Sequence, residues 1–385
     1  MKKLIPILLC VIVILCGCQS EAEPENIDFS TAPTFPVEEI TDYPVMELKN
    51  DGAESTGHWG LNTDIGRFYF DHVPDPQGGE NAILMFEDVS SGESYPLCAK
   101  VNCAHTRDSE GCGAFFNIEP YQMHYDGTFL YLVDHEEWGV GLAHIGLIRQ
   151  KPDGSDREVL ISPRGKENET CTIQKCIFQG NTVYFELEIM RPGASLGQAA
   201  QYIKRFCVGD LTTGEYEVLP GRYDDCTLIG IHGSELLIKR TTGNGGWEPL
   251  ENFTELFFLL DIETGEITVM LEIKGGDRSY STDAEAGYLY LIKDDGYDYW
   301  VVYEDIPVTN DPEMEEFSSN TGDRYFVDIP NRKVYKWSDV EIFYKDGSRA
   351  GYWLYLKWDE GHTSATRYAR SIETGEEFLY DEIFY

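Results

Sequence analysis

The chain is poor in basic residues. Of its 385 residues, 30 are Lys or Arg and 68 are Asp or Glu, so the formal net charge is −38 at pH 7. Duplex nucleic acid carries one negative charge per ~1.7 Å of helix axis, and most of this surface would repel it. We therefore expect no nucleic-acid partner.

Motifs of several common catalytic sites are also missing. The sequence contains no His-Glu-x-x-His motif, no Walker A motif and no Rossmann glycine fingerprint. Glycoside hydrolysis needs two carboxylates roughly 5–9.5 Å apart in space, and a sequence with 68 acids does not single out such a pair. No catalytic residue is therefore predicted, which favours a binding role over an enzyme.

The N-terminus carries an apolar run that predicts export. Lys2 and Lys3 precede roughly a dozen apolar residues, which are too few for a stable membrane span. The run ends in Leu15-Cys16-Gly17-Cys18, which resembles the lipobox of bacterial lipoproteins. That resemblance implies removal of residues 1–17, attachment of diacylglycerol to Cys18, and a lipid-anchored protein on the outer face of the cell membrane. The alternative is an ordinary signal peptide with incidental cysteines.

Residues 18–50 are expected to form a flexible acidic tether. The stretch from Gln19 to Asn50 is rich in Pro and Glu and shows no sustained periodicity. Such a segment buries too little apolar area to offset the entropy lost on ordering. About thirty flexible residues span roughly 30 Å, enough to hold a domain away from the lipid headgroups.

From residue 51 to 385 the sequence predicts one all-β domain. Long helical periodicity is absent, and short apolar runs bounded by turns recur instead. One such run follows each of Gly66, Gly127, Gly180, Gly233, Gly287 and Gly351. A second turn comes later in each unit, at Ser91-Gly92, Asp153-Gly154, Thr213-Gly214, Thr264-Gly265, Pro330-Asn331 and Thr374-Gly375. Each unit is therefore predicted to contain four antiparallel strands joined by tight turns.

Six such units predict a six-bladed β-propeller, in which each blade buries its faces against its neighbours. The Asp153-Gly154-Ser155 turn resembles the turn of TolB-like propeller repeats, and the Asp-x-x-Thr-Gly-Glu segments resemble outer propeller hairpins. This resemblance covers Trp59 to Tyr385 and implies a fold rather than an activity. A large β-sandwich, or two small β-domains, is the alternative.

The long connections are predicted to lie at one end of the propeller. They fall between the second and third strands of a unit, as in Lys293–Arg324, or between units, as in Ala99–Pro120. Alternate connections of an up-and-down blade share a face, and binding residues concentrate on loops held by a rigid scaffold. This loop-rich face is the expected working surface.

The strongest local pattern is Cys98-x4-Cys103-x-His105-x6-Cys112, in the link between the first two units. Three thiolates and one imidazole make a complete tetrahedral set for a structural zinc ion. Disulfides are the competing interpretation, because exported proteins favour them. Four further cysteines make seven beyond Cys18, an odd number that disulfides alone cannot pair: Cys171, Cys176, Cys207 and Cys226. No cofactor other than zinc is predicted.

Acidic and aromatic residues at the ends of second strands supply ligand-binding candidates. Flat aromatic faces beside carboxylates suit sugars or cationic groups. The candidates are Asp71, His72, Asp134, His135, Trp138, Asp294, Trp300, Trp358 and Asp359. At each position taken singly, a solvated loop or packing between strands is the stronger interpretation, because acidic and aromatic residues are scattered throughout this sequence.

These observations together predict a membrane-anchored, extracytoplasmic β-propeller that binds a peptide, glycan or protein ligand. Its charge restricts that ligand to a neutral, cationic or metal-bridged one. A propeller-fold carbohydrate-active hydrolase or lyase is the alternative function, and a surface spacer without a ligand is a third.

Overall fold

The structure is a computed structural model that describes residues 27, 29–41, 44–46, 60–74, 80–106, 112–116, 119–133, 146–166, 168–193, 199–242, 254–274, 280–285, 288–293, 324–337, 348–349, 352–358 and 365–379 (the described residues). Among the described residues there is no helix, and hence none that could cross a membrane. The predicted export signal and Cys18 lie outside this part of the chain.

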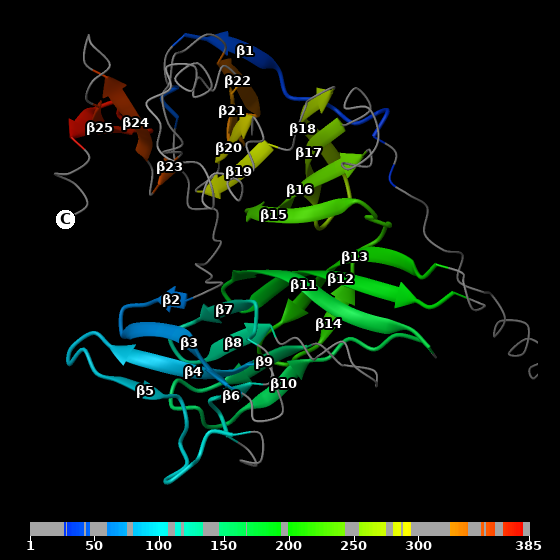
Figure 1. Ribbon diagram of the computed structural model, residues 1–385. Coiled ribbons are helices and arrows are strands. Elements are labelled where there is room, and N and C mark those ends of the chain that lie inside the picture. Colours follow the sequence, from blue (N-terminus) through cyan, green and yellow to red (C-terminus); the bar gives the residue numbers. More distant parts are fainter. Residues whose placement is uncertain are drawn as a thin grey trace, which may run out of the picture.

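The strands of the described residues form six sheets that follow one another along the chain (Figure 1). The first sheet contains β2 (Gly60–Asn62), β3 (Gly66–Pro74), β4 (Glu80–Asp88), β5 (Ser94–Pro96) and β6 (Phe115–Phe116). The second sheet contains β7 (Gln122–Tyr125), β8 (Leu130–Val133), β9 (Leu147–Gln150) and β10 (Glu158–Ile161). The third sheet contains β11 (Thr170–Gln179), β12 (Thr182–Arg191), β13 (Gln201–Asp210) and β14 (Tyr216–Val218). The fourth sheet contains β15 (Cys226–His232), β16 (Glu235–Thr242), β17 (Thr254–Asp261) and β18 (Ile267–Lys274). The fifth sheet contains β19 (Tyr280–Glu285), β20 (Tyr288–Lys293), β21 (Arg324–Asp328), β22 (Lys333–Trp337) and the N-terminal β1 (Val37–Ile40). The sixth sheet contains β23 (Ser348–Arg349), β24 (Tyr352–Trp358), β25 (Ala365–Ser371) and β26 (Glu377–Leu379).

Each sheet is built on four strands in chain order, and neighbouring strands run antiparallel except where β1 joins. For the described residues, the prediction of an all-β fold with four-stranded antiparallel units is therefore confirmed. The turns before the last strands contain Gly92, Gly154, Gly214, Gly265 and Gly375, all with φ between 68° and 75°. This left-handed conformation strains residues with a Cβ, which explains the glycine at these five turns.

Side chains from the preceding strands fix several of these turns. Asp210 accepts hydrogen bonds from the backbone N–H groups of Thr212 and Thr213. Asp261 does the same for Glu263 and Thr264. The recurring Asp-x-x-Thr-Gly-Glu pattern is therefore a set of aspartate-stabilised turns.

The hydrophobic core lies between consecutive sheets rather than in one central mass. Phe68 of the first sheet and Leu132 of the second belong to one buried cluster. Similar clusters join the second sheet to the third, the third to the fourth and the fourth to the fifth. The first strands of the first five sheets are also in contact in chain order, from β2 with β7 to β15 with β19. The first five sheets thus pack against one another in sequence order.

Part of the segment predicted to be a flexible tether packs on the sheets. Val37 to Ile40 form β1, which pairs in parallel with β22, and Thr34 bridges to Val269 of β18 (Figure 1). Phe35, 6% exposed, enters the core cluster of the fourth and fifth sheets. The Met46 amide then donates to the Ile372 carbonyl, just after β25. Partners about 300 residues away in sequence, which local composition does not reveal, explain this difference.

Candidate metal centre

The outer edge of the first sheet is divided between two short strands. β5 pairs with β4 at Met85↔Pro96, and β6 pairs with the same strand at Ala82↔Phe116. Leu84 of β4 lies between these two pairings and hydrogen-bonds to the chain on both sides of the gap between β5 and β6. Its carbonyl accepts from the Leu97 N–H and its own N–H donates to the Ala114 carbonyl, each at 2.8 Å. Residues 97–114, here called the edge loop, thus leave the sheet edge at one point and return to it.

This placement corrects the expected position of the four candidate ligands. They were predicted to lie in the link between units on the loop-rich face, whereas they lie in an excursion from the outer edge of the first sheet. The prediction was wrong because β6 has two residues, Phe115 and Phe116. A run this short does not show in sequence that the chain has returned to its own sheet.

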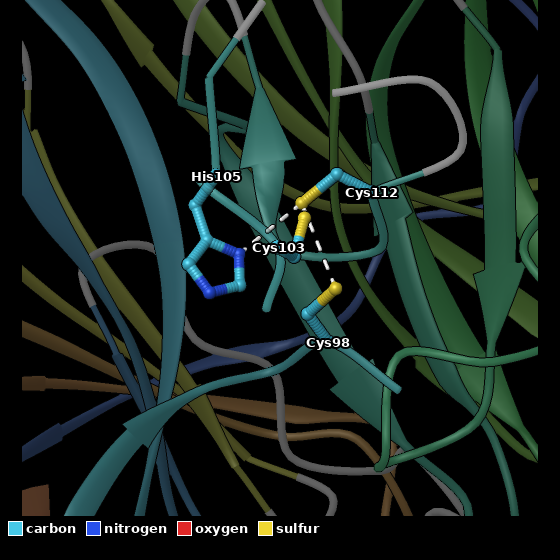
Figure 2. A group of neighbouring side chains, drawn as sticks. All are labelled: Cys98, Cys103, His105 and Cys112. Atoms are coloured by element: carbon cyan, nitrogen blue, oxygen red, sulfur yellow. Dashed lines mark hydrogen bonds between the residues drawn. The ribbon is translucent and has the colours of Figure 1, made fainter. Parts of the chain in front are cut away.

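The four predicted ligands converge on one point (Figure 2). One donor atom from each of Cys98, Cys103, His105 and Cys112 lies within 4.8 Å of every other. The Sγ atoms of Cys98 and Cys112 are 3.8 Å apart, and His105 Nδ1 is 3.4 Å from Cys112 Sγ. Two sulfurs at about 2.3 Å from a tetrahedral zinc would be about 3.8 Å apart. The donor types and their spacing therefore fit a metal ion bound by three thiolates and one imidazole.

The cluster sits at the boundary between core and solvent. Cys112 is buried, whereas Cys98, Cys103 and His105 are partly exposed. Ile83 and Ala114 pack beneath it. Burial raises the pKa of the Cys112 thiol to about 11, so a metal ion must displace its proton to bind at neutral pH.

The backbone of the edge loop is strained at the ligands. Asn102 and His105 adopt the left-handed conformation, with φ of 59° and 51°. Asparagine and histidine enter this region more often than most residues, yet holding a residue other than glycine there still costs of order 1–3 kcal/mol. Coordination by His105 would supply an interaction that offsets this cost.

All seven cysteines of the described residues are free thiols. Cys171, Cys176 and Cys207 lie in the core between the second and third sheets, and Cys226 lies in the next core. Burial raises the pKa of Cys171 to about 11 and the pKa of Cys207 and of Cys226 to about 12. These four thiols are therefore protonated packing groups, and the structure has neither of the two bridges that they would allow.

The structure describes few of the ligand-binding candidates. Asp71 and His72 are exposed near the end of β3, and His72 Nε2 lies 2.9 Å from Glu119 Oε2. Burial raises the pKa of Glu119, and the neighbouring His72 opposes that shift. Trp358 is the last residue of β24. The other candidates lie outside the described residues: Asp134, His135, Trp138, Asp294, Trp300 and Asp359.

Sequence reasoning missed one possible nucleophile motif. Gly193-Ala-Ser-Leu-Gly197 matches the Gly-x-Ser-x-Gly pattern of serine hydrolases. In those enzymes the serine sits between a strand and a helix. Here the motif falls in the connection between the antiparallel strands β12 and β13, with Ala194 to Gly197 outside the described residues. This context does not match a hydrolase elbow.

Buried ion pairs elsewhere in the sheets have a structural role. Glu186, with a side chain 3% exposed, lies 3.1 Å from Lys204 Nζ and accepts a hydrogen bond from the Leu228 amide of the fourth sheet. Lys204 also donates to the Cys226 carbonyl at 2.6 Å. This pair therefore joins the third sheet to the fourth.

Comparisons with known proteins give no family. No family model and no curated protein sequence matches the chain. Among solved structures, a puromycin-hydrolyzing peptidase from Mycobacterium tuberculosis is similar at 10% identity with a TM-score of 0.45, covering 89% of this chain and 56% of its own. The β-propeller domain of the Trilobed protease from Pyrococcus furiosus is similar at 9% identity with a TM-score of 0.30, covering 89% of this chain and 99% of its own. The tricorn protease is similar at 11% identity with a TM-score of 0.22, covering 81% and 28%. Likenesses this weak establish no shared activity.

Proposed function

We propose that the chain is an extracytoplasmic, lipid-anchored binding or assembly module, built as a six-bladed propeller with a structural zinc ion in the edge loop. The convergence of three thiols and one imidazole on a single point carries the metal part of this proposal. Four protein ligands complete a tetrahedral shell, so no position is left for water or substrate. The zinc would stabilise the scaffold and take no part in a reaction.

Three features support the propeller. The described residues form six sheets on four-stranded antiparallel units, four core clusters each join two consecutive sheets, and the first strands of the first five sheets are in contact in order. A propeller requires this arrangement because every blade packs its faces on its neighbours.

The anchoring part of the proposal is supported by the Leu15-Cys16-Gly17-Cys18 pattern. Ile27 and Phe29 already pack against the core of the third and fourth sheets. Nine residues from Cys18 to Ile27 span at most about 32 Å when fully extended, whereas thirty fully extended residues would span about 108 Å. A lipid on Cys18 would therefore hold these sheets closer to the membrane than a thirty-residue tether would.

Metal analysis tests the structural zinc. We expect a soluble chain of residues 19–385, purified under reducing conditions, to hold one zinc per chain. The double variant Cys98→Ser/Cys112→Ser should hold none, while Cys171→Ala, which removes a thiol outside the cluster, should keep it. Zinc well below one equivalent in the unaltered chain, with all thiols reduced, would contradict the proposal.

A ligand screen tests the binding role. The same soluble chain is screened against glycans and peptides for thermal shift and for product formation. Binding without turnover is expected. Product formation that is lost when a loop Asp or Glu is replaced would instead show the carbohydrate-active enzyme, and the absence of any ligand would indicate a spacer.

A further inference from the structure

The edge loop is in direct backbone contact with the second sheet. Gly154, in the hairpin between β9 and β10, lies between the two ends of the loop. A Cβ added to Gly113 would lie 2.1 Å from the Gly154 carbonyl oxygen, and one added to Gly154 would lie 2.0 Å from the Leu97 carbonyl oxygen. Two glycines thus permit an approach that a side chain would prevent.

Arg157 of the same hairpin holds the returning end of the loop. Its Nη1 atom donates to the carbonyls of Cys112 and Phe115, at 3.2 and 3.0 Å. Its guanidinium lies over the ring of Phe116, 4.0 Å from the centroid. A single side chain of the second sheet therefore contacts the backbone of a metal ligand and the strand β6 that follows it.

We infer that metal binding in the edge loop and docking of the β9–β10 hairpin are coupled, with Arg157 as the positioning residue. This inference rests on the proposed zinc site. An ion bound by Cys98 and Cys112 fixes their neighbours Leu97 and Gly113, which are the two backbone segments that enclose Gly154. Because the two equilibria are linked, docking of the hairpin must raise the affinity for zinc by the same factor by which bound zinc raises the equilibrium constant for docking.

The coupled parts form two walls of one cleft. Ala99 and Lys100 of the edge loop face the hairpin segment from Gly154 to Val159 across a space of about 550 Å³. Loss of the metal would free one wall and loss of Arg157 the other. The shape of this cleft therefore depends on whether zinc is bound and whether the hairpin is docked.

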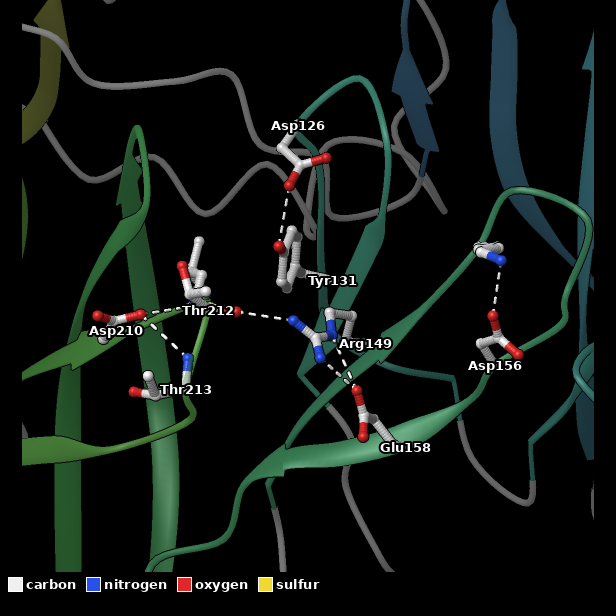
Figure 3. A network of polar contacts seen from close by, with 10 residues as sticks. Asp126, Tyr131, Arg149, Asp156, Glu158, Asp210, Thr212 and Thr213 are labelled. Atoms are coloured by element: carbon white, nitrogen blue, oxygen red, sulfur yellow. Dashed lines mark hydrogen bonds and ion pairs between the residues drawn. The ribbon is translucent and has the colours of Figure 1, made fainter.

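Arg149 provides a matched control in the same sheet (Figure 3). It donates to the Leu211 carbonyl of the third sheet at 2.9 Å, and its guanidinium lies 4.8 Å from the ring centroid of Phe129. It also pairs with Glu158. Arg149 thus resembles Arg157 chemically and also pairs with one hairpin side chain, the exposed Glu158, but its backbone partner is the Leu211 carbonyl of the third sheet rather than a carbonyl of the edge loop.

The first test measures zinc affinity by competition with a chromogenic chelator. We expect Arg157→Ala to weaken zinc binding about tenfold, within the usual range of coupling between sites, and Arg149→Ala to change it less than about twofold. Arg157→Lys keeps the charge but loses the paired donors, so it should fall between the unaltered chain and Arg157→Ala. Equal zinc affinity in the unaltered chain and in Arg157→Ala would overturn the coupling.

The second test needs no variant and so does not depend on the folding of Arg157→Ala. Hydrogen exchange is followed in the hairpin segment 151–158 before and after removal of zinc. Exchange should speed up there and stay unchanged in the corresponding hairpin segment 261–266 of the fourth sheet, where a Cβ added to Gly265 would meet nothing within 4 Å. Unchanged exchange in both hairpins would overturn the coupling even with one zinc bound. A chain that binds no zinc would overturn the site itself.

Discussion

Single buried residues join neighbouring sheets at several points, and Glu186 shows how. Its carboxylate accepts from the Leu228 amide of the fourth sheet and pairs with Lys204 of its own sheet. Removing one partner of such a pair leaves an uncompensated charge in a poorly hydrated place, which costs more than the pair contributes. The interface between the third and fourth sheets should therefore be sensitive to this side chain.

We expect Glu186→Ala to lower the free energy of unfolding by about 3 kcal/mol, because Lys204 and the Leu228 amide lose their acceptor. Urea unfolding measures the change. Glu217→Ala, at an exposed position of β14, is the control and should change stability by less than about 0.5 kcal/mol. A loss below about 1 kcal/mol for Glu186→Ala would show that water replaces the lost contacts.

Gly154 allows a comparison between backbone strain and steric contact. Gly154 and Gly265 have φ of 75° and 73°, but an added Cβ meets the Leu97 carbonyl only at Gly154 and nothing within 4 Å at Gly265. Gly265→Ala should cost about 1–2 kcal/mol through its conformation alone. Gly154→Ala should cost about 1–3 kcal/mol more, since the contact must open. Equal losses in chemical unfolding would show that the edge loop moves away freely.

At the scale of elements, the outer hairpins share one stabilising device. The side chains of Asp88, Asp210 and Asp261 each accept backbone hydrogen bonds from the turn that follows. These bonds favour the charged form and lower the pKa of all three carboxyls. The largest contribution comes from the Ser90 hydroxyl at Asp88 and from the backbone amides of Thr212 at Asp210 and Thr264 at Asp261. The turns are therefore strongest when the aspartates are ionised.

This lowered pKa sets the direction of a pH effect. A carboxyl with a lower pKa in the folded state stabilises the fold at neutral pH, and that stabilisation is lost as the pH falls through the folded-state pKa. The triple variant Asp88→Asn/Asp210→Asn/Asp261→Asn keeps an acceptor oxygen that does not titrate. Its stability should fall less than that of the unaltered chain between about pH 6 and pH 2. Parallel pH curves in thermal unfolding would contradict this role.

Elements defined by local sequence were predictable, and those defined by distant partners were not. Each four-strand unit has its own turn glycines, such as Gly214 and Gly265, so the repeats are visible in sequence. The metal ligands from Cys98 to Cys112 are close in sequence and were found by spacing. Arg157 was missed because it binds backbone carbonyls 42 and 45 residues earlier, and carbonyls leave no pattern in the sequence.

At the scale of the whole molecule, the N-terminal segment connects sheets that are far apart along the chain. Phe29 packs against Phe258 of the fourth sheet with ring centroids 4.9 Å apart, and Arg240 lies over the same ring. Phe35 enters the next core, β1 extends the fifth sheet, and Met46 bonds to the end of β25. Residues 27–46, here called the strap, therefore contact the fourth, fifth and sixth sheets in turn.

We expect a chain that begins at residue 47 to be less stable and more prone to association than one that begins at residue 19. Without the strap, β22 would lose its parallel partner and expose an unpaired edge, and such edges promote association between chains. The place occupied by Phe35 would also become an apolar gap, which costs about 3–5 kcal/mol when a phenylalanine is lost from a core. Thermal unfolding and light scattering measure the two effects.

A synthetic strap peptide separates loss of this docking from general damage to the fold. A peptide of residues 27–46 added to the shortened chain should raise its melting temperature in a saturable way, because it binds the folded state only. The same peptide with Phe35→Ala should fail at equal concentration, while Val37→Ala, at a position 53% exposed, should act like the original. If neither the original nor the Val37→Ala peptide restores stability, the strap does not form an independent docking segment. Its contacts would then require covalent continuity with the sheets.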